Sequence, residues 1–164
     1  LIDQGYTEPA RLAIRGGSNG GLLVGAAVVQ RPELFGAVVC QVPLLDMIHY
    51  DRLKIAKFWV SEYGDPSNPD HFKFLQAYSP YHHVVEGTPY PAILLTTAEN
   101  DSRVDAMHAR KMAARLQEAT SSDEPILLYV DNKAGHGQGK PVAKIIEDQA
   151  DVYAFLDATI GSSV

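Results

Sequence analysis

Residues 11–30, RLAIRGGSNGGLLVGAAVVQ, decide the fold of this chain. The stretch opens with a short strand pattern at 11–15, continues through a cluster of glycines, and ends in an apolar helical run at 22–30 that Pro32 stops. A strand that leads directly into a helix is the repeating unit of a parallel α/β sheet. We therefore expect the remaining sequence to alternate strands with helices.

The remaining sequence does alternate in this way. Continuous apolar runs, which are typical of parallel strands covered on both faces, occur at 37–42, 92–97 and 126–130. Helical patterns occur at 53–63, 70–77, 106–118 and 142–160. With right-handed crossovers, this order predicts a doubly wound, mostly parallel α/β sheet of about four strands.

The composition indicates a globular domain and excludes several classes of partner. The 164 residues are 46% apolar and 21% charged, which suits one domain of ordinary size. A net charge of −6 gives no basic surface for phosphates, so we expect no nucleic-acid partner. No apolar run approaches the roughly 20 residues that cross a bilayer, so we expect no membrane association. The single cysteine, Cys40, cannot form an internal disulfide, and its apolar strand favours a buried, inert thiol.

The glycine cluster contains Gly16-x-Ser18-x-Gly20, the pattern of a nucleophile elbow. In such an elbow a serine lies on a tight strand-to-helix turn, and side chains two positions before and after it would collide with the neighbouring strand and helix. The turn places the backbone N–H of Asn19 at a helix N-terminus, where it can stabilise an oxyanion. The same short string also occurs in glycine-rich turns and phosphate loops. Here the flanking strand and helix favour the elbow, and no lysine stands at the Walker position.

Two further polar residues follow later strands, where function lies in open α/β sheets. Asp101 follows the third expected strand and His136 follows the fourth, which gives the chain order serine, acid, histidine. In such a set the imidazole takes the proton of the Ser18 hydroxyl and returns it to the leaving amine, while the carboxylate orients the imidazole. Glu99 and Asp105 are alternative candidates for the acid.

The remaining histidines are given no catalytic role. We expect His82 and His83 to pack or cap within a loop, His108 to lie in a helix, and His49 and His71 to be isolated. No H-E-x-x-H or similar ligand spacing is present, so we expect neither a metal site nor a cofactor.

The chain resembles the catalytic domain of the prolyl oligopeptidase family of serine peptidases, in its prolyl endopeptidase branch. The resemblance covers about residues 11–156 and rests on GGSNGGLL (16–23), QRPELFG (30–36), YSPY (78–81), DSRV (101–104) and AGHG (134–137). Asparagine after the serine is typical of this branch, whereas the dipeptidyl-peptidase branch more often has tyrosine. The resemblance implies the α/β-hydrolase fold and a catalytic triad of Ser18, Asp101 and His136.

The resemblance also implies substrate contacts. Trp59 matches the tryptophan that stacks on the substrate proline, and a flat indole gives that ring a large contact area at little entropic cost. Core packing is the alternative reading for this lone tryptophan. Other walls of the proline pocket match Leu44, Tyr63 and Val104. Arg103 matches an arginine that hydrogen-bonds a substrate carbonyl, and a local ion pair with Asp105 or Glu99 is its alternative.

The chain departs from the family in extent. The family has an N-terminal β-propeller and a larger hydrolase sheet, and residues 1–164 match only the C-terminal half of that sheet. We therefore expect a C-terminal part of the catalytic domain, whose partner is the remainder of its own polypeptide. The family's second oxyanion donor, a tyrosine hydroxyl, belongs to the upstream half, and segment 53–57 matches the family poorly. The strand before Ser18 would then have an open edge, and the isolated fragment is expected to be inactive.

The sequence thus predicts a serine endopeptidase that hydrolyses short peptides on the carboxyl side of proline through an acyl-enzyme. Three alternatives remain: a related oligopeptidase that prefers basic residues, an acylaminoacyl peptidase of the same fold, and a non-catalytic hydrolase-like binding fragment. The chain starts at Leu1 without a signal-peptide pattern, which says little about the parent protein. A cytoplasmic location is favoured over the periplasm or secretion.

Overall fold

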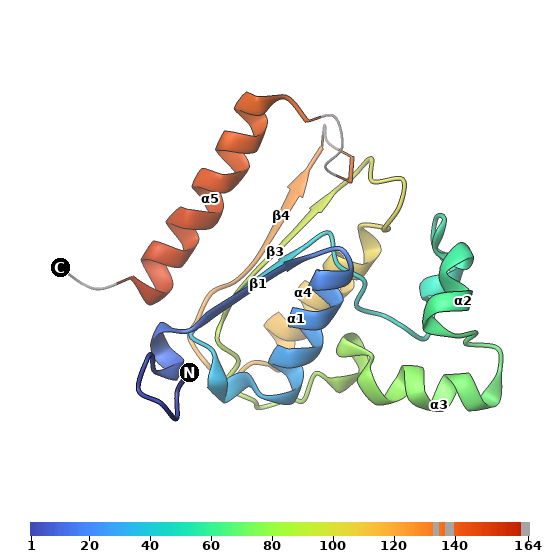
Figure 1. Ribbon diagram of the computed structural model, residues 1–164, viewed down its shortest axis with the longest axis horizontal. Helices are drawn as coiled ribbons and strands as arrows, with labels where there is room; N and C mark the ends of the chain where they lie inside the picture. The colour runs from blue at the N-terminus through green and yellow to red at the C-terminus, as the bar shows by residue number, and fades with distance from the viewer. Residues whose placement is uncertain (133–134, 137–139, 162–164) are drawn as a thin grey trace.

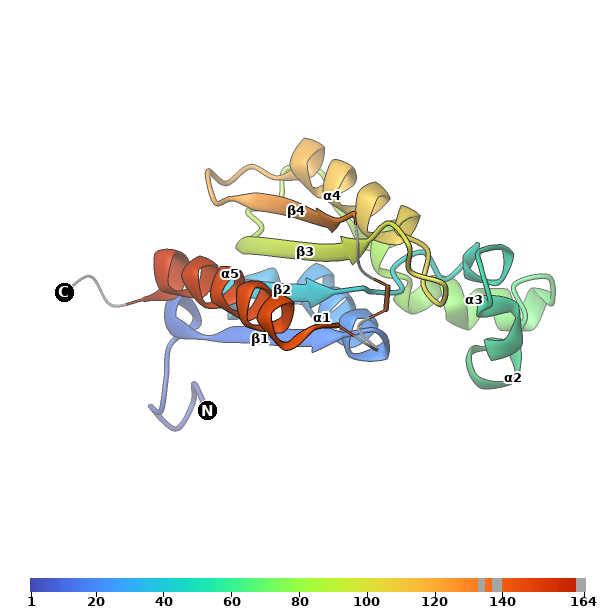
Figure 2. The same cartoon turned by 90° about the horizontal axis from the view of Figure 1, so that it is seen from above.

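The computed structural model of the chain describes residues 1–132, 135–136 and 140–161. At its centre lies a parallel sheet with the strands β1 (Ala13–Gly17), β2 (Ala37–Gln41), β3 (Ala92–Ala98) and β4 (Ile126–Asp131). The strands lie side by side in chain order, and each neighbouring pair is parallel (Figure 2). The strand that leads to Ser18, β1, is therefore an edge strand of the sheet that the structure describes.

Helices cover both faces of this sheet. On one face lie α1 (Asn19–Gln30) and α4 (Met107–Ala119), and on the other lies α5 (Val142–Ile160) (Figures 1 and 2). Successive residues of a strand point to opposite faces. In β2, Val38 and Cys40 therefore pack toward α1 and α4, and Val39 packs toward α5. This arrangement confirms the predicted doubly wound α/β fold.

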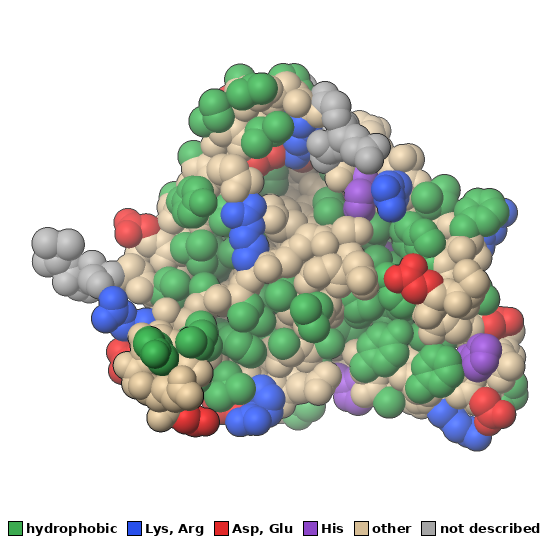
Figure 3. All heavy atoms as spheres, viewed as in Figure 1, with side chains coloured by type: hydrophobic (Ala, Val, Ile, Leu, Met, Phe, Trp, Pro, Cys, Tyr) green, Lys and Arg blue, Asp and Glu red, His purple; other side chains and the backbone are tan. Residues whose placement is uncertain are grey.

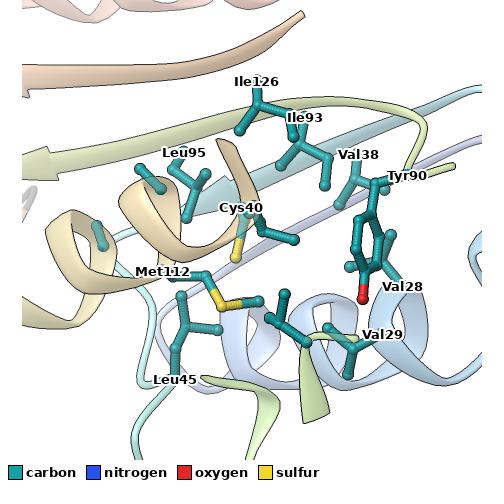
Figure 4. Close-up of a cluster of buried hydrophobic side chains, with 14 of the residues drawn as sticks. Val28, Val29, Val38, Cys40, Leu45, Tyr90, Ile93, Leu95, Met112 and Ile126 are labelled. Atoms are coloured by element: carbon teal, nitrogen blue, oxygen red, sulfur yellow. The ribbon is translucent and has the colours of Figure 1, made fainter. Parts of the chain in front are cut away.

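The larger core lies between the sheet and the pair α1 and α4 (Figure 4). Val28, Ile93 and Met112, from three different elements, are each no more than 2% exposed. Cys40 lies among them with its Sγ 3.2 Å from the carbonyl oxygen of Gly21, and burial raises the pKa of this thiol to about 12. The thiol therefore stays protonated at neutral pH, and its expected burial is confirmed.

The face toward α5 is less completely filled. A cavity of about 1030 Å³ lies between α5 and the sheet, and Figure 3 shows the molecule hollowed there. Leu127 and Tyr129 of β4 line it and remain 47% and 36% exposed. Apolar sheet surface on this face is thus left accessible within this chain.

The structure differs from the expected elements mainly at the start of α1 and within residues 53–63. Helix α1 begins at Asn19 rather than at Leu22. The sequence pattern did not reveal its first turn, because Gly20 and Gly21 have low helix propensity. The single helix expected at 53–63 is wrong: this range holds the 3₁₀ turn Ala56–Trp59 and the one-turn helix α2 (Val60–Tyr63). Lys54, with a positive φ of 52°, separates them from an earlier 3₁₀ turn at Tyr50–Arg52.

The helix expected at 70–77 is confirmed as α3 (Pro69–Tyr78). It begins after Asn68, whose side-chain oxygen accepts hydrogen bonds from the backbone N–H groups of Asp70 and His71, as an N-cap residue does. Within the described ranges, no helix combines the length and the apolar character needed to cross a bilayer.

Candidate active site

Ser18 is the single residue between β1 and α1, and it has φ 57° and ψ −118°. A positive φ is costly for a residue other than glycine, and such strain persists where the surrounding structure enforces it. A Cβ at Gly16 would lie 2.1 Å from the carbonyl oxygen of Gly20, so glycine is required at position 16. At Gly20 a Cβ would meet no described atom within 4 Å, so the expected collision there is wrong. The close approach falls on Gly21, whose Cβ would lie 2.7 Å from Pro43.

The structure brings Ser18, Asp101 and His136 together, although each follows a different strand. Nε2 of His136 lies 3.1 Å from Oγ of Ser18, and Nδ1 lies 2.6 Å from Oδ2 of Asp101. Both distances are within hydrogen-bond range. The expected motif neighbours Ala134 and Gly137 lie outside the described residues.

The two alternative acids, Glu99 and Asp105, interact with other partners. Glu99 is hydrogen-bonded to Arg110, and Asp105 accepts from the backbone N–H of Met107 and lies 3.9 Å from Lys54. Of the three candidate carboxylates, Asp101 alone contacts His136 among the described residues.

Asp101 is held so that one oxygen remains for the imidazole. The residue is 1% exposed, and its Oδ1 accepts hydrogen bonds from the backbone N–H groups of Arg103 and Val104 at 2.8 and 2.9 Å. Oδ2 faces Nδ1 of His136. When Nδ1–H donates to this carboxylate, Nε2 carries the lone pair that faces the Ser18 hydroxyl. The arrangement can therefore accept the serine proton.

Asn19 is the first residue of α1, and the N–H groups in the first turn of a helix have no intrahelical acceptor. They lie at the positive end of the helix dipole, next to Ser18. The Asn19 side chain has a partner that the sequence reasoning missed: its Oδ1 accepts a hydrogen bond from the Tyr63 hydroxyl at 2.9 Å. Local sequence carries no signal for this contact, because the two residues come from separate elements.

The four predicted pocket walls belong to one apolar cluster. Leu44 and Val104 are each 2% exposed, and Trp59 and Tyr63 are partly buried against them. Trp59 is thus partly buried, and part of its indole remains accessible to solvent. Arg103 is exposed, and neither of the carboxylates considered for it, Glu99 or Asp105, is its partner.

One group among the described residues has metal-ligand chemistry, namely Asp46, His49 and His82, whose ligand atoms lie within 4.8 Å of one another. Burial alone would raise the pKa of Asp46, but hydrogen bonds from Lys111 and His49 outweigh it and hold this pKa below its usual value. The buried carboxylate is therefore already neutralised by a lysine, and the donor set has no need of a metal ion. His49, 3.0 Å from Asp46, is not isolated as expected.

The other histidines act as local hydrogen-bonding groups. His82 lies 2.8 Å from Oγ of Ser79 and His83 lies 2.7 Å from the carbonyl oxygen of Gln76, as expected for capping residues of a loop. His71 is not isolated, because its Nδ1 accepts from the backbone N–H of Asp65 at 3.0 Å. His108 lies in α4, as expected, and is 1% exposed.

Comparison with known proteins agrees with this geometry. The sequence profile of the Prolyl oligopeptidase family matches residues 1–163. The chain belongs to the prolyl oligopeptidase family. A prolyl endopeptidase of Dictyostelium discoideum is 42% identical over 163 residues, which are 98% of this chain and 21% of that protein.

Solved structures of the prolyl oligopeptidase family superpose on nearly the whole chain. One from a study of two prolyl endopeptidases has a TM-score of 0.94 at 53% identity and covers 98% of this chain and 24% of its own. Oligopeptidase B of Leishmania major also has a TM-score of 0.94, at 29% identity, with 100% and 23% covered. The sheet thus belongs to the α/β-hydrolase fold of this family. The chain spans less than a quarter of the length of these relatives.

Proposed function

We propose that this chain carries the catalytic triad of a serine endopeptidase that cleaves peptides after proline. The observation that carries the proposal is the continuous contact from Asp101 through His136 to Ser18, with 2.6 and 3.1 Å between the heavy atoms. Proton transfer between a nucleophile and its general base needs separations of about 2.6–3.2 Å. Both contacts meet this requirement.

The reaction follows from these positions. Nε2 of His136 takes the hydroxyl proton while Oγ of Ser18 attacks the peptide carbonyl carbon, and the backbone N–H of Asn19 donates to the resulting oxyanion. The imidazolium returns the proton to the amine as the C–N bond breaks, which leaves an acyl-enzyme. A water molecule then gives its proton to the same imidazole and attacks the ester, and Ser18 regains its proton as the acid product leaves.

The pocket cluster favours proline over a basic residue. Leu44, Trp59, Tyr63 and Val104 present apolar and aromatic surface, which suits a compact ring without charge. A pocket for arginine or lysine would need a carboxylate in its wall, whereas none of these four side chains carries a charge. The exposed guanidinium of Arg103 is available to donate to a substrate carbonyl oxygen.

We further propose that residues 1–164 form the C-terminal part of the catalytic domain and that the remainder of the polypeptide completes it. The open edge of β1 and the cavity beneath α5 support this, because both leave sheet surface without cover. A second oxyanion donor would also come from that remainder, as the family resemblance implies. The isolated fragment is then inactive even with its triad intact.

The test uses the full-length parent protein and three reporters: a blocked peptide that releases its dye after proline, one that releases it after arginine or lysine, and an acylated single amino acid. We expect hydrolysis, labelling of Ser18 by a fluorophosphonate, and loss of both in Ser18→Ala. Hydrolysis only after arginine or lysine would favour the related oligopeptidase, and hydrolysis only of acylated amino-terminal residues would favour the acylaminoacyl peptidase. Folded protein with neither labelling nor hydrolysis would leave a binding module.

A further inference from the structure

The loop that carries His136 is short and is anchored at both ends by polar contacts that the reaction itself does not use. It leaves β4 at Asp131 and reaches Lys140 immediately before the proline that precedes α5. Oδ2 of Asp131 lies 3.5 Å from Nζ of Lys140, so one ion pair joins the two ends of the loop. In the sequence, His136 lies between these two paired residues.

The ion pair belongs to a cluster that joins β4 to α5, formed by Asp131, Lys140, Lys144 and Asp148. Lys140 is also hydrogen-bonded to Asp148, and Lys144 lies 2.9 Å from Oδ1 of Asp148 and 3.7 Å from Oδ2 of Asp131. The carboxylates are 6% and 17% exposed and the lysines 20% and 27%. Two positive and two negative groups therefore face one another in a largely enclosed place.

The pKa shifts of Asp148 and Lys144 agree with this pairing of opposite charges. Burial alone would raise the pKa of Asp148, but hydrogen bonds from Lys140 and Lys144 keep it below the usual value. Hydrogen bonds with Tyr129 and Asp148 raise the pKa of Lys144. Asp148 and Lys144 are thus both charged at neutral pH.

A second connection joins the same loop to the loop of the catalytic acid. Nδ2 of Asn100, the residue before Asp101, donates to the carbonyl oxygen of Asn132 at 3.1 Å. The backbone N–H of Glu99 donates to the carbonyl oxygen of Asp131 at 2.9 Å. A Cβ on Gly135 would lie 3.7 Å from the Asn100 carbonyl oxygen, so the two loops are in contact beside the triad.

We propose that Lys140, through Asp131, and Asn100, through Asn132, are positioning residues that hold His136 between Ser18 and Asp101. This inference rests on the proposed peptidase function. A largely buried ion pair stabilises a fold little compared with apolar side chains of the same shape, because desolvation offsets the attraction between the charges. Its effect here is to hold together Asp131 and Lys140, between which His136 lies in the chain, and so to restrain the position of the imidazole. Proton transfer from Ser18 is sensitive to that geometry, because a displacement of about 1 Å can cost on the order of 100-fold in rate.

The test compares four variants of the full-length parent with the wild type. Lys140→Met keeps the length of the side chain without its charge, and Lys140→Arg restores a cation. Asn100→Ala removes the donor to Asn132. The matched control is Lys73→Met, because Lys73 pairs with Asp70 in an exposed position on α3, where its side chain is 76% exposed. For each protein we measure kcat and KM on the proline reporter, the rate of fluorophosphonate labelling, and the melting temperature.

We expect Lys140→Met to lower kcat and labelling about 10-fold, and Asn100→Ala about fivefold, with KM within about twofold of the wild type. Lys140→Arg should recover most of the loss, and Lys73→Met should match the wild type. Unchanged kcat in both Lys140→Met and Asn100→Ala, or a loss that Lys140→Arg shares fully, would overturn the inference. So would a loss explained entirely by a smaller folded fraction. Wild-type protein that neither labels nor hydrolyses would instead refute the proposed function, and this inference with it.

Discussion

The Tyr63 hydroxyl donates a hydrogen bond to Oδ1 of Asn19, which ties a wall of the proposed proline pocket to the residue after the nucleophile. The ring of Tyr63 packs edge-on against Tyr50, with 5.7 Å between the ring centroids, and the Tyr50 hydroxyl donates to the Gly64 carbonyl at 2.7 Å. Burial raises the pKa of Tyr63, so its hydroxyl stays protonated and can donate at neutral and mildly alkaline pH.

Tyr63→Phe should therefore lower kcat of the parent enzyme on the proline reporter about fivefold, the effect of losing one hydrogen bond of ordinary strength. KM should change little, because the ring that forms the pocket wall remains packed on Tyr50. Steady-state kinetics on the reporter would show this. An increase in KM with unchanged kcat would mean that the hydroxyl contacts the substrate instead of orienting Asn19.

Trp59→Ala should lower kcat/KM for cleavage after proline by about 30-fold, as expected when a large aromatic contact is removed from a binding pocket. Hydrolysis of a small activated ester, which does not need the pocket, should change little. Phe58→Ala is the matched control, because Phe58 is adjacent in sequence but 71% exposed. Equal losses on both substrates would show that Trp59 serves the core and not the substrate.

Gly16→Ala and Gly20→Ala should differ sharply, although both glycines belong to the same motif. The first places a methyl group 2.1 Å from a backbone oxygen at the elbow and should abolish fluorophosphonate labelling of Ser18. The second adds a methyl group with no described atom within 4 Å, inside a helix that favours alanine, and should leave labelling near the wild-type rate. Labelling lost equally in both would indicate that another part of the parent polypeptide lies against Gly20.

Much of the fold could be predicted because local patterns specify it. The buried strands read as continuous apolar runs, and α5 was predicted at 142–160 with the bounds that the structure has. The segment at 53–63 failed, because its helical pattern does not reveal that Lys54 adopts a positive φ. Such a backbone conformation is set by the surrounding tertiary structure and not by residue type.

The candidate site, like the fold, could be predicted only in part. Chain order and strand ends pointed to Ser18, Asp101 and His136, because parallel strands deliver their following loops to one edge of the sheet. The contacts that orient these residues were not predictable in this way. Asn100 with Asn132 and Tyr63 with Asn19 join segments distant in sequence, and a single polar residue in a loop carries no periodic signal.

His108 should make the stability of the parent depend on pH. Its Nδ1 accepts from the backbone N–H groups of Leu45 and Asp46 at 3.3 and 3.1 Å, and burial lowers its pKa to about 4. In the unfolded chain the His108 imidazole becomes protonated near pH 6.5, whereas in the folded protein it stays neutral down to about pH 4. The free energy of unfolding therefore falls as the pH decreases from about 6.5 to about 4. The loss from this group is roughly 3 kcal/mol at most.

His108→Gln is the comparison for this measurement, because the amide oxygen can still accept a hydrogen bond but does not titrate. The free energy of unfolding, measured in denaturant from pH 7.5 to 4, should fall more steeply in the wild type than in the variant. Parallel curves would show that the imidazole is not held neutral by the fold.

Residues 1–164 expressed alone should associate, because β1 pairs with β2 on one side and has no described strand on the other. Unpaired backbone N–H and C=O groups along that edge, next to accessible apolar sheet surface, favour pairing between chains. Light scattering and thermal melting should find oligomers or insoluble protein, without fluorophosphonate labelling at Ser18. Co-expression with the preceding part of the same polypeptide should give a soluble complex that labels. A soluble monomer of residues 1–164 with a cooperative melting transition would contradict this, since it would mean that the open edge of β1 is tolerated in water.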